Sequence, residues 1–147
     1  MFILLGLLSA MVMEYFLHRI YLHNPSHAHI TEHHKIFHKN YENPAYGYKD
    51  IVSKPAYVFV SSIFALLITI ILSFSFDNAY IIYTSAVLYL LWVEWVHYLF
   101  HSPKGSYIEK LTLFQSLKEH HHIHHLEFKI NYGIGSSLMD YIFRTKK

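Results

Sequence analysis

Residues Ala79 to Phe100 read AYIIYTSAVLYLLWVEWVHYLF, and His101 follows directly. Within this stretch only Glu94 and His97 can carry a charge near neutral pH. A bilayer core of about 30 Å is crossed by about 20 helical residues, so the stretch is long enough to span it. It therefore predicts a membrane-spanning helix that ends in two histidines spaced four residues apart.

Two other apolar stretches precede it. The first runs from Met1 to about Leu22 and is interrupted only near its end, by Glu14, His18 and Arg19. The second, residues 57–76, contains no charged residue, and Asp77-Asn78 then forms a short turn before the third stretch. We expect an all-α membrane protein with about three transmembrane helices and a helical cap, in which residues 1–147 form a single domain.

Composition supports this fold class and excludes several functions. The chain has 147 residues, of which 53% are hydrophobic and only 15% charged. It has no cysteine, which excludes disulfides, zinc–thiolate sites and iron–sulfur clusters. The formal charge of +2, without a basic tract, argues against a nucleic-acid partner.

The basic residues predict the orientation of the chain. With three spans, all 12 Lys and Arg fall in the 18–56 loop or the C-terminal tail, which lie on the same side of the membrane. The positive-inside rule makes that side cytoplasmic. All 14 histidines fall on this side too, so the sequence predicts an integral membrane protein with its histidine clusters at the cytoplasmic face.

The histidines form four spaced clusters, and histidine is the commonest metal ligand. They are His18 and His23; His29, His33 and His34; His97 and His101; and His121, His124 and His125. Residues 107–128 are expected to form an amphipathic helix whose apolar arc contains the last three, at angles of about 280°, 220° and 320°. His120 and His122 fall outside this arc or at its edge, and we expect them to face solvent.

The number of clustered histidines indicates two metal ions. About ten imidazoles exceed what one ion binds. His18 and His23 are five residues apart and would diverge on a regular helix. Either the helix breaks there or the two histidines serve different metals, and we favour the second interpretation.

Two acidic residues accompany the clusters. Glu14 is four residues before His18, and Glu94 is three residues before His97. Ionisable residues within a span are costly and are usually functional. We expect each carboxylate to accept the second ring N–H of a ligating histidine; the alternative is an acid that reaches out to the interface.

The ordered clusters resemble the histidine boxes of the fatty acid hydroxylase superfamily, a group of membrane di-iron enzymes. The similar residues are Glu14-x3-His18-Arg19-x3-His23, His29-x3-His33-His34, Glu94-x2-His97-x3-His101 and Leu117-Lys118-x2-His121-x2-His124-His125. The tail, Asn131-Tyr132-Gly133-Ile134-Gly135 followed by Met139-Asp140, is similar to the closing segment of that family. Arg144 stands where the family often has glycine. The second box has three intervening residues where two are common, so His38 is an alternative ligand to His29.

The resemblance implies an oxygen-dependent di-iron lipid hydroxylase or desaturase that oxidises a C–H bond of a fatty acyl or related lipid. It implies two iron ions as cofactors and dioxygen as co-substrate, although imidazole also suits zinc. A separate electron donor, of ferredoxin or cytochrome type, is the expected protein partner. The alternatives are a carotenoid-type hydroxylase and a non-catalytic membrane metal-binding or transport protein.

Overall fold

A computed structural model describes residues 1–24, 79–101 and 107–147, together with Ile63, Leu67 and Ile71. All regular structure in these ranges is helical, as the sequence predicts. The predicted second span, 57–76, lies outside the described residues except at those three positions, which are helical and exposed.

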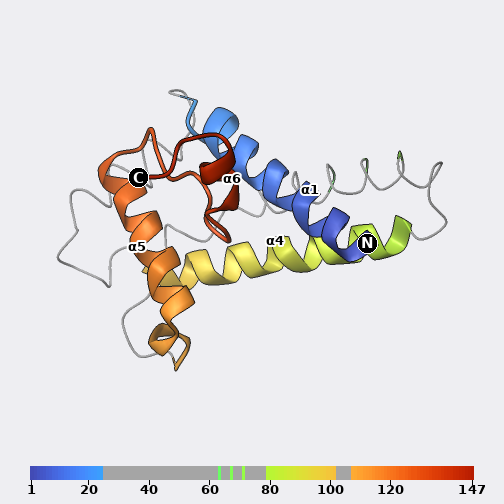
Figure 1. Cartoon of the computed structure of the whole chain (residues 1–147), viewed down its shortest axis with the longest axis horizontal. Coiled ribbons are helices and arrows are strands. Elements are labelled where there is room, and N and C mark those ends of the chain that lie inside the picture. The colour runs from blue at the N-terminus through green and yellow to red at the C-terminus, as the bar shows by residue number, and fades with distance from the viewer. Residues whose placement is uncertain (25–62, 64–66, 68–70, 72–78, 102–106) are drawn as a thin grey trace.

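Two long apolar helices form the body of the protein (Figure 1). Helix α1 spans Phe2–Phe16 and continues as η1 over Leu17–Leu22, and α4 spans Ala79–His101. Their mean hydropathies are 1.5 and 1.4, and each is long and apolar enough to cross a membrane. Leucines such as Leu4 and Leu88 are more than half exposed on them, which suits contact with lipid better than contact with water.

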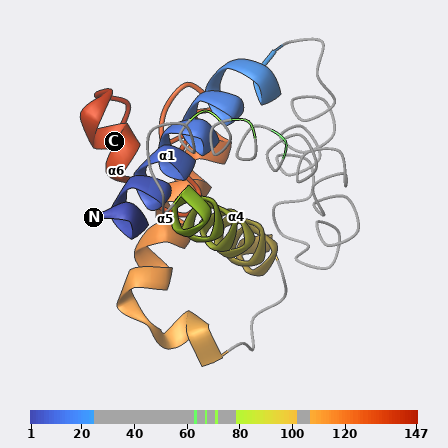
Figure 2. The ribbon, with the colours of Figure 1, turned by 90° about the vertical axis from the view of Figure 1, so that its right-hand side faces the viewer.

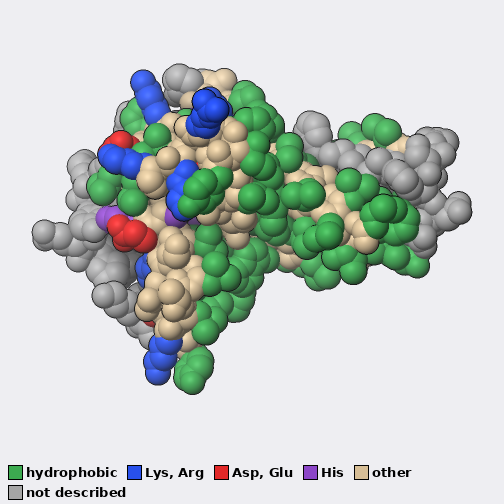
Figure 3. Space-filling view, viewed as in Figure 1, with side chains coloured by type: hydrophobic (Ala, Val, Ile, Leu, Met, Phe, Trp, Pro, Cys, Tyr) green, Lys and Arg blue, Asp and Glu red, His purple; other side chains and the backbone are tan. Residues whose placement is uncertain are grey.

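The surface divides along the length of these helices. In Figure 3, apolar side chains cover the end that contains the first turns of α1 and α4, whereas Lys, Arg, Asp and Glu gather at the other end. That other end also carries the visible histidines. This division is the one expected for a protein whose apolar end is embedded in a bilayer and whose polar end projects from it.

Small residues allow α1 and α4 to approach closely. A Cβ at Gly6 would collide with the side chain of Ser85 and the carbonyl group of Ile82, so only glycine fits there. Close approach through small residues is typical of helix pairs in membranes. The two helices run in the same direction, and both therefore end on the polar side (Figure 1).

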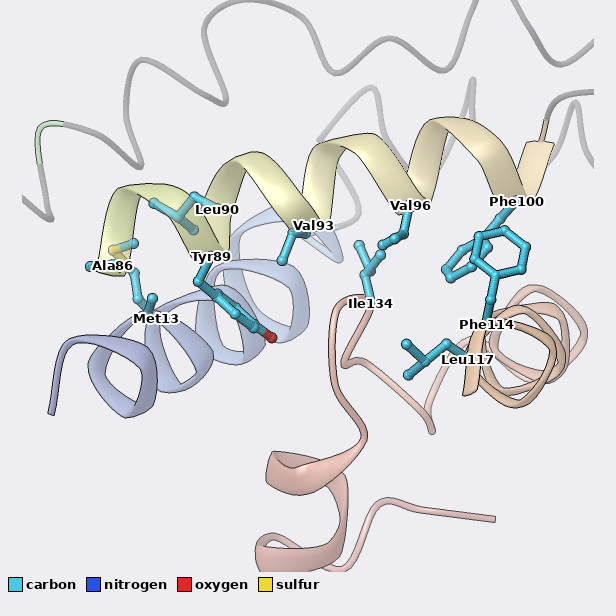
Figure 4. Packing of buried hydrophobic residues seen from close by; sticks show 11 residues of the cluster. Met13, Ala86, Tyr89, Leu90, Val93, Val96, Phe100, Phe114, Leu117 and Ile134 are labelled. Carbon is cyan, nitrogen blue, oxygen red and sulfur yellow. The ribbon is translucent and has the colours of Figure 1, made fainter. Parts of the chain in front are cut away.

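Helix α5, Thr112–Leu126, packs across the end of α4. Phe100 and Phe114 join the two helices with their rings 5.2 Å apart, and Leu117 and Ile134 extend the same core (Figure 4). The structure divides the single helix predicted over 107–128, because the backbone of Leu111 is extended. A 3-10 turn, η3 (Tyr107–Lys110), precedes Leu111, and α5 follows it.

The C-terminal residues cover one side of the end of α1. The short helix α6, Leu138–Ile142, lies on the far side of α1 from α4, as the end-on view of α4 in Figure 2 shows. Tyr15 stacks on Phe143 with ring centroids 4.9 Å apart, and its hydroxyl group is 3.0 Å from that of Thr145. Chain segments more than 100 residues apart thus meet around the end of α1.

Candidate metal centre

His18 and His23 are brought together by a local change of helix type. Residues Leu17–Leu22 form a π-helix, in which the backbone bond runs from residue i+5 to residue i. The N–H of His23 accordingly donates to the carbonyl of His18 at 3.2 Å, and the two rings lie 5.0 Å apart. The favoured interpretation, that this pair diverges toward two metals, was wrong, because it assumed a regular α-helix.

His124 of α5 completes a first histidine group with His18 and His23. Its Nε2 lies 3.1 Å from the Nε2 of His23, and its ring is 4.6 Å from that of His18. One nitrogen from each of the three rings lies within 4.8 Å of the others. Burial lowers the pKa of His23 to about 4, which keeps this imidazole neutral near pH 7, as a metal ligand must be.

A second histidine group contains His97, His101 and His121, all of them buried. His97 and His101 are one turn apart on α4, so their rings leave the same face of the helix. The Nε2 of His121 lies 3.0 Å from the Nε2 of His101 and 3.0 Å from the Nε2 of His125. His125 therefore points at the same place as the three members of the group.

Both groups have the composition of a metal site. Each nitrogen of a neutral imidazole carries either a proton or a lone pair. When several Nε2 atoms converge at about 3 Å, a shared cation can use all of their lone pairs, whereas a hydrogen bond uses only one. Imidazole nitrogen suits iron, zinc and copper, so the residues fit the ions that the sequence predicts.

Helix α5 holds the two groups side by side. His121 belongs to the second group and His124 to the first, and their rings stack with centroids 5.9 Å apart. His121, His124 and His125 are all buried, as their positions on the apolar arc predict. The two groups that could each hold a metal ion are therefore adjacent, and α5 contributes histidines to both.

Backbone carbonyls orient two of these rings. The Nδ1 of His18 lies 2.6 Å from the carbonyl oxygen of Tyr132, and the Nδ1 of His124 lies 2.6 Å from that of Ile130. A carbonyl only accepts, so in each ring Nδ1 carries the proton. The Nε2 atom of each ring is then left with its lone pair, in the form that binds a metal.

The structure gives Glu14 different partners from those predicted. This buried carboxylate accepts hydrogen bonds from the hydroxyl of Tyr89 at 2.7 Å and from the backbone N–H groups of Ile134 and Gly135. The expected acceptor role toward His18 belongs to the carbonyl of Tyr132 instead. The reason is the C-terminal segment, whose N–H groups bind Glu14 and whose Tyr132 carbonyl lies against His18. Glu94 is half-buried on α4, and its predicted role stays a prediction.

His120 does not face solvent, contrary to the helical-arc prediction. It is 6% exposed, and its Nε2 lies 2.9 Å from a carboxylate oxygen of Asp140. The arc reasoning failed because the C-terminal segment covers that side of α5. His122 is half-buried.

Asp140, the partner of His120, has a place in the site that was not predicted from the sequence. Burial raises its pKa, but hydrogen bonds from His120, from Thr145 and from two backbone N–H groups outweigh burial and hold the pKa below its ordinary value. The carboxylate is therefore charged at neutral pH. The only signal in the sequence was its place in the closing segment, between apolar residues.

Four predicted or alternative ligands, His29, His33, His34 and His38, lie outside the described residues.

A family model for fatty acid hydroxylases matches residues 3–145, which is nearly the whole chain. The chain belongs to the fatty acid hydroxylase family. Comparison with curated proteins and with solved structures found no match.

Membership of the fatty acid hydroxylase family agrees with the described geometry. The match includes both histidine groups, the apolar helices and the C-terminal segment. The family and the two apolar helices together indicate a membrane protein. The family indicates an oxidoreductase, and the histidine groups provide places where it could hold metal ions.

Proposed function

We propose that the protein is an oxygen-dependent lipid hydroxylase or desaturase with two iron ions, acting on a C–H bond of a fatty acyl or related lipid. The observation that carries this proposal is the pair of adjacent histidine groups, joined through α5, at the polar end of two apolar helices. His29, His33 and His34 are proposed as further ligands, with His38 as the alternative to His29.

The chain's own residues would hold, orient and shield the reacting groups. His18, His97, His121 and His124 are all buried, so bulk water has little access to their rings. When bound, two iron ions supply the reductive activation of dioxygen that oxidation of an unactivated C–H bond requires. An all-imidazole donor set adds no negative charge to these ions, which keeps them strongly electron-withdrawing.

The place of the histidine groups suits a membrane lipid as substrate. They lie at the end of α1 and α4, next to the apolar surface that these helices present. An acyl chain can enter from the lipid side while a separate ferredoxin- or cytochrome-type donor approaches from water. If α1 and α4 both cross the membrane in the same direction, the chain must cross back between them. A third span would provide that crossing.

A non-catalytic metal transporter is the second candidate. Transport would need polar groups along the whole thickness of the membrane. In the described parts of α1 and α4, the buried polar residues lie near the histidine end, and toward the other end only Ser85 is buried and polar. This distribution favours an enzyme that holds its metals at one face over a transporter.

The test is metal content combined with oxygen uptake and lipid analysis. Protein purified in mild detergent from iron-supplemented cells should contain about two metal ions per chain. The iron-loaded protein should consume dioxygen when given a reductant and a lipid extract, and lipids from cells with and without the gene should differ by an added oxygen or a double bond. One ion or fewer in well-folded protein would contradict the dinuclear centre. Two ions without oxygen uptake would favour storage or transport.

A further inference from the structure

Two carbonyl oxygens of segment 130–135 face the first histidine group. Ile130 and Tyr132 stand on either side of Asn131, which turns the backbone with a φ of 54°. They accept the Nδ1 protons of His124 and His18, each at 2.6 Å. Both acceptors therefore serve histidines of the first group, which also contains His23.

Two buried carboxylates bind the backbone N–H groups of the same segment. Asp140 accepts the N–H groups of Tyr132 and Gly133, each at 2.8 Å. Glu14 accepts the next two N–H groups, those of Ile134 at 2.5 Å and Gly135 at 3.0 Å. Four consecutive backbone donors thus end on two side chains that are 1% exposed or less.

Each carboxylate is in turn fixed by other elements. Asp140 accepts the hydroxyl of Thr145 at 2.7 Å and pairs with His120 of α5 at 2.9 Å. Glu14 lies on α1 and accepts the hydroxyl of Tyr89 on α4 at 2.7 Å. A Cβ at Gly133 would collide with the Ser136 carbonyl and come within 2.9 Å of the Asp140 carboxylate, so the segment fits only without a side chain there.

We propose that segment 130–135, clamped by Glu14 and Asp140, is a positioning element that fixes the Nδ1–H tautomer of His18 and His124. The inference rests on the proposed metal centre. It adds that the segment orients ligands of only one of the two ions. Without the clamp, the carbonyls of Ile130 and Tyr132 move away, and His18 and His124 can place their proton on Nε2 instead. A ring protonated on Nε2 does not offer that atom to the metal. Glu14 and Asp140 are thus positioning residues for one of the two ions.

Zinc is a suitable probe because it binds imidazole and has no redox chemistry. The full chain in detergent would be stripped of metal and titrated with zinc against a chromophoric chelator. For Asp140→Asn and Glu14→Gln, we expect one site to keep its affinity and the other to weaken by about 10- to 100-fold, the usual effect of losing an outer hydrogen-bond partner. Glu109→Gln, which neutralises a half-buried acid paired with Lys118 of α5, is the matched control and should leave both affinities unchanged.

A second measurement needs no metal. Nitrogen-15 chemical shifts of the histidine rings in metal-free protein report which nitrogen carries the proton. The wild type should show Nδ1–H for His18 and His124, and both variants should show a mixture. If Asp140→Asn does not fold, Thr145→Val removes only the hydroxyl that donates to Asp140 and should weaken the same zinc site to a smaller extent.

Equal weakening of both zinc sites, or unchanged affinity with unchanged tautomers in folded variants, would overturn the positioning role. A wild-type protein that binds fewer than two zinc ions would instead contradict the proposed dinuclear centre. In that case the tautomers of His18 and His124 in the variants still decide the positioning role by themselves.

Discussion

His18 and His23 point to the same place because the backbone between them winds as a π-helix, closed by a 3.2 Å bond from the N–H of His23 to the carbonyl of His18. On an α-helix, residues five apart differ by about 140° around the axis and their rings would separate. Single π turns within α-helices are frequent at functional sites. Here the turn places both rings against His124.

Double substitutions should reveal the division into two histidine groups. His23→Ala and His124→Ala should each remove about one metal ion per chain, and their combination should remove no more, because both belong to the first group. His23→Ala combined with His97→Ala should remove both ions. Elemental analysis of the purified variants measures this, with Tyr21→Ala, an exposed neighbour, as control. Equal metal content in the two double variants would show that the groups do not act separately.

His120→Ala should destabilise the protein more than His122→Ala. The first substitution leaves the buried carboxylate of Asp140 without its partner on α5, which should cost about 1–3 kcal/mol of unfolding free energy. The second affects a half-buried ring and should cost about 0.5 kcal/mol or less. Thermal unfolding of metal-free protein in detergent compares them. Equal midpoints would mean that the His120–Asp140 pair adds no stability.

Arg144→Gly should stabilise the protein. Arg144 is exposed and has φ of 55°, a backbone conformation that glycine adopts without steric cost. Removing that strain should gain up to about 1 kcal/mol, partly offset by the greater freedom of glycine in the unfolded chain. Lys129→Gly, at an exposed position without positive φ, is the control and should not raise the unfolding midpoint. A lower midpoint for Arg144→Gly would indicate that the arginine side chain contributes more than its backbone costs.

Cysteine labelling should establish the orientation in the membrane. The chain has no cysteine, so a single introduced thiol reports its own position. Lys129→Cys lies at the histidine end and should resist an impermeant thiol reagent in intact cells, because all of the basic residues predict that this end is cytoplasmic. Tyr80→Cys, exposed at the start of α4, should react. Both should react after permeabilisation, and the reverse pattern in intact cells would invert the proposed topology.

Local sequence was enough to predict the apolar helices and part of the site. The spans Phe2–Leu22 and Ala79–His101 follow from composition, which requires no knowledge of distant contacts. The four-residue spacing of His97 and His101 places both rings on one face of any α-helix, and the second histidine group uses that face. The burial of His121, His124 and His125 follows from the apolar arc of α5 in the same way.

Tertiary structure alone decided how the rings are oriented and which side chains fix them. The carbonyls of Ile130 and Tyr132 meet His124 and His18, and in the second case the contact joins residues 114 positions apart. No helical periodicity encodes such a contact. His120 was predicted to be exposed because α5 was considered alone, whereas the C-terminal segment buries it against Asp140. Helix type and helix faces are set by neighbouring residues, but the proton position on a ligating imidazole is set by whichever acceptor the folded chain brings to its second nitrogen.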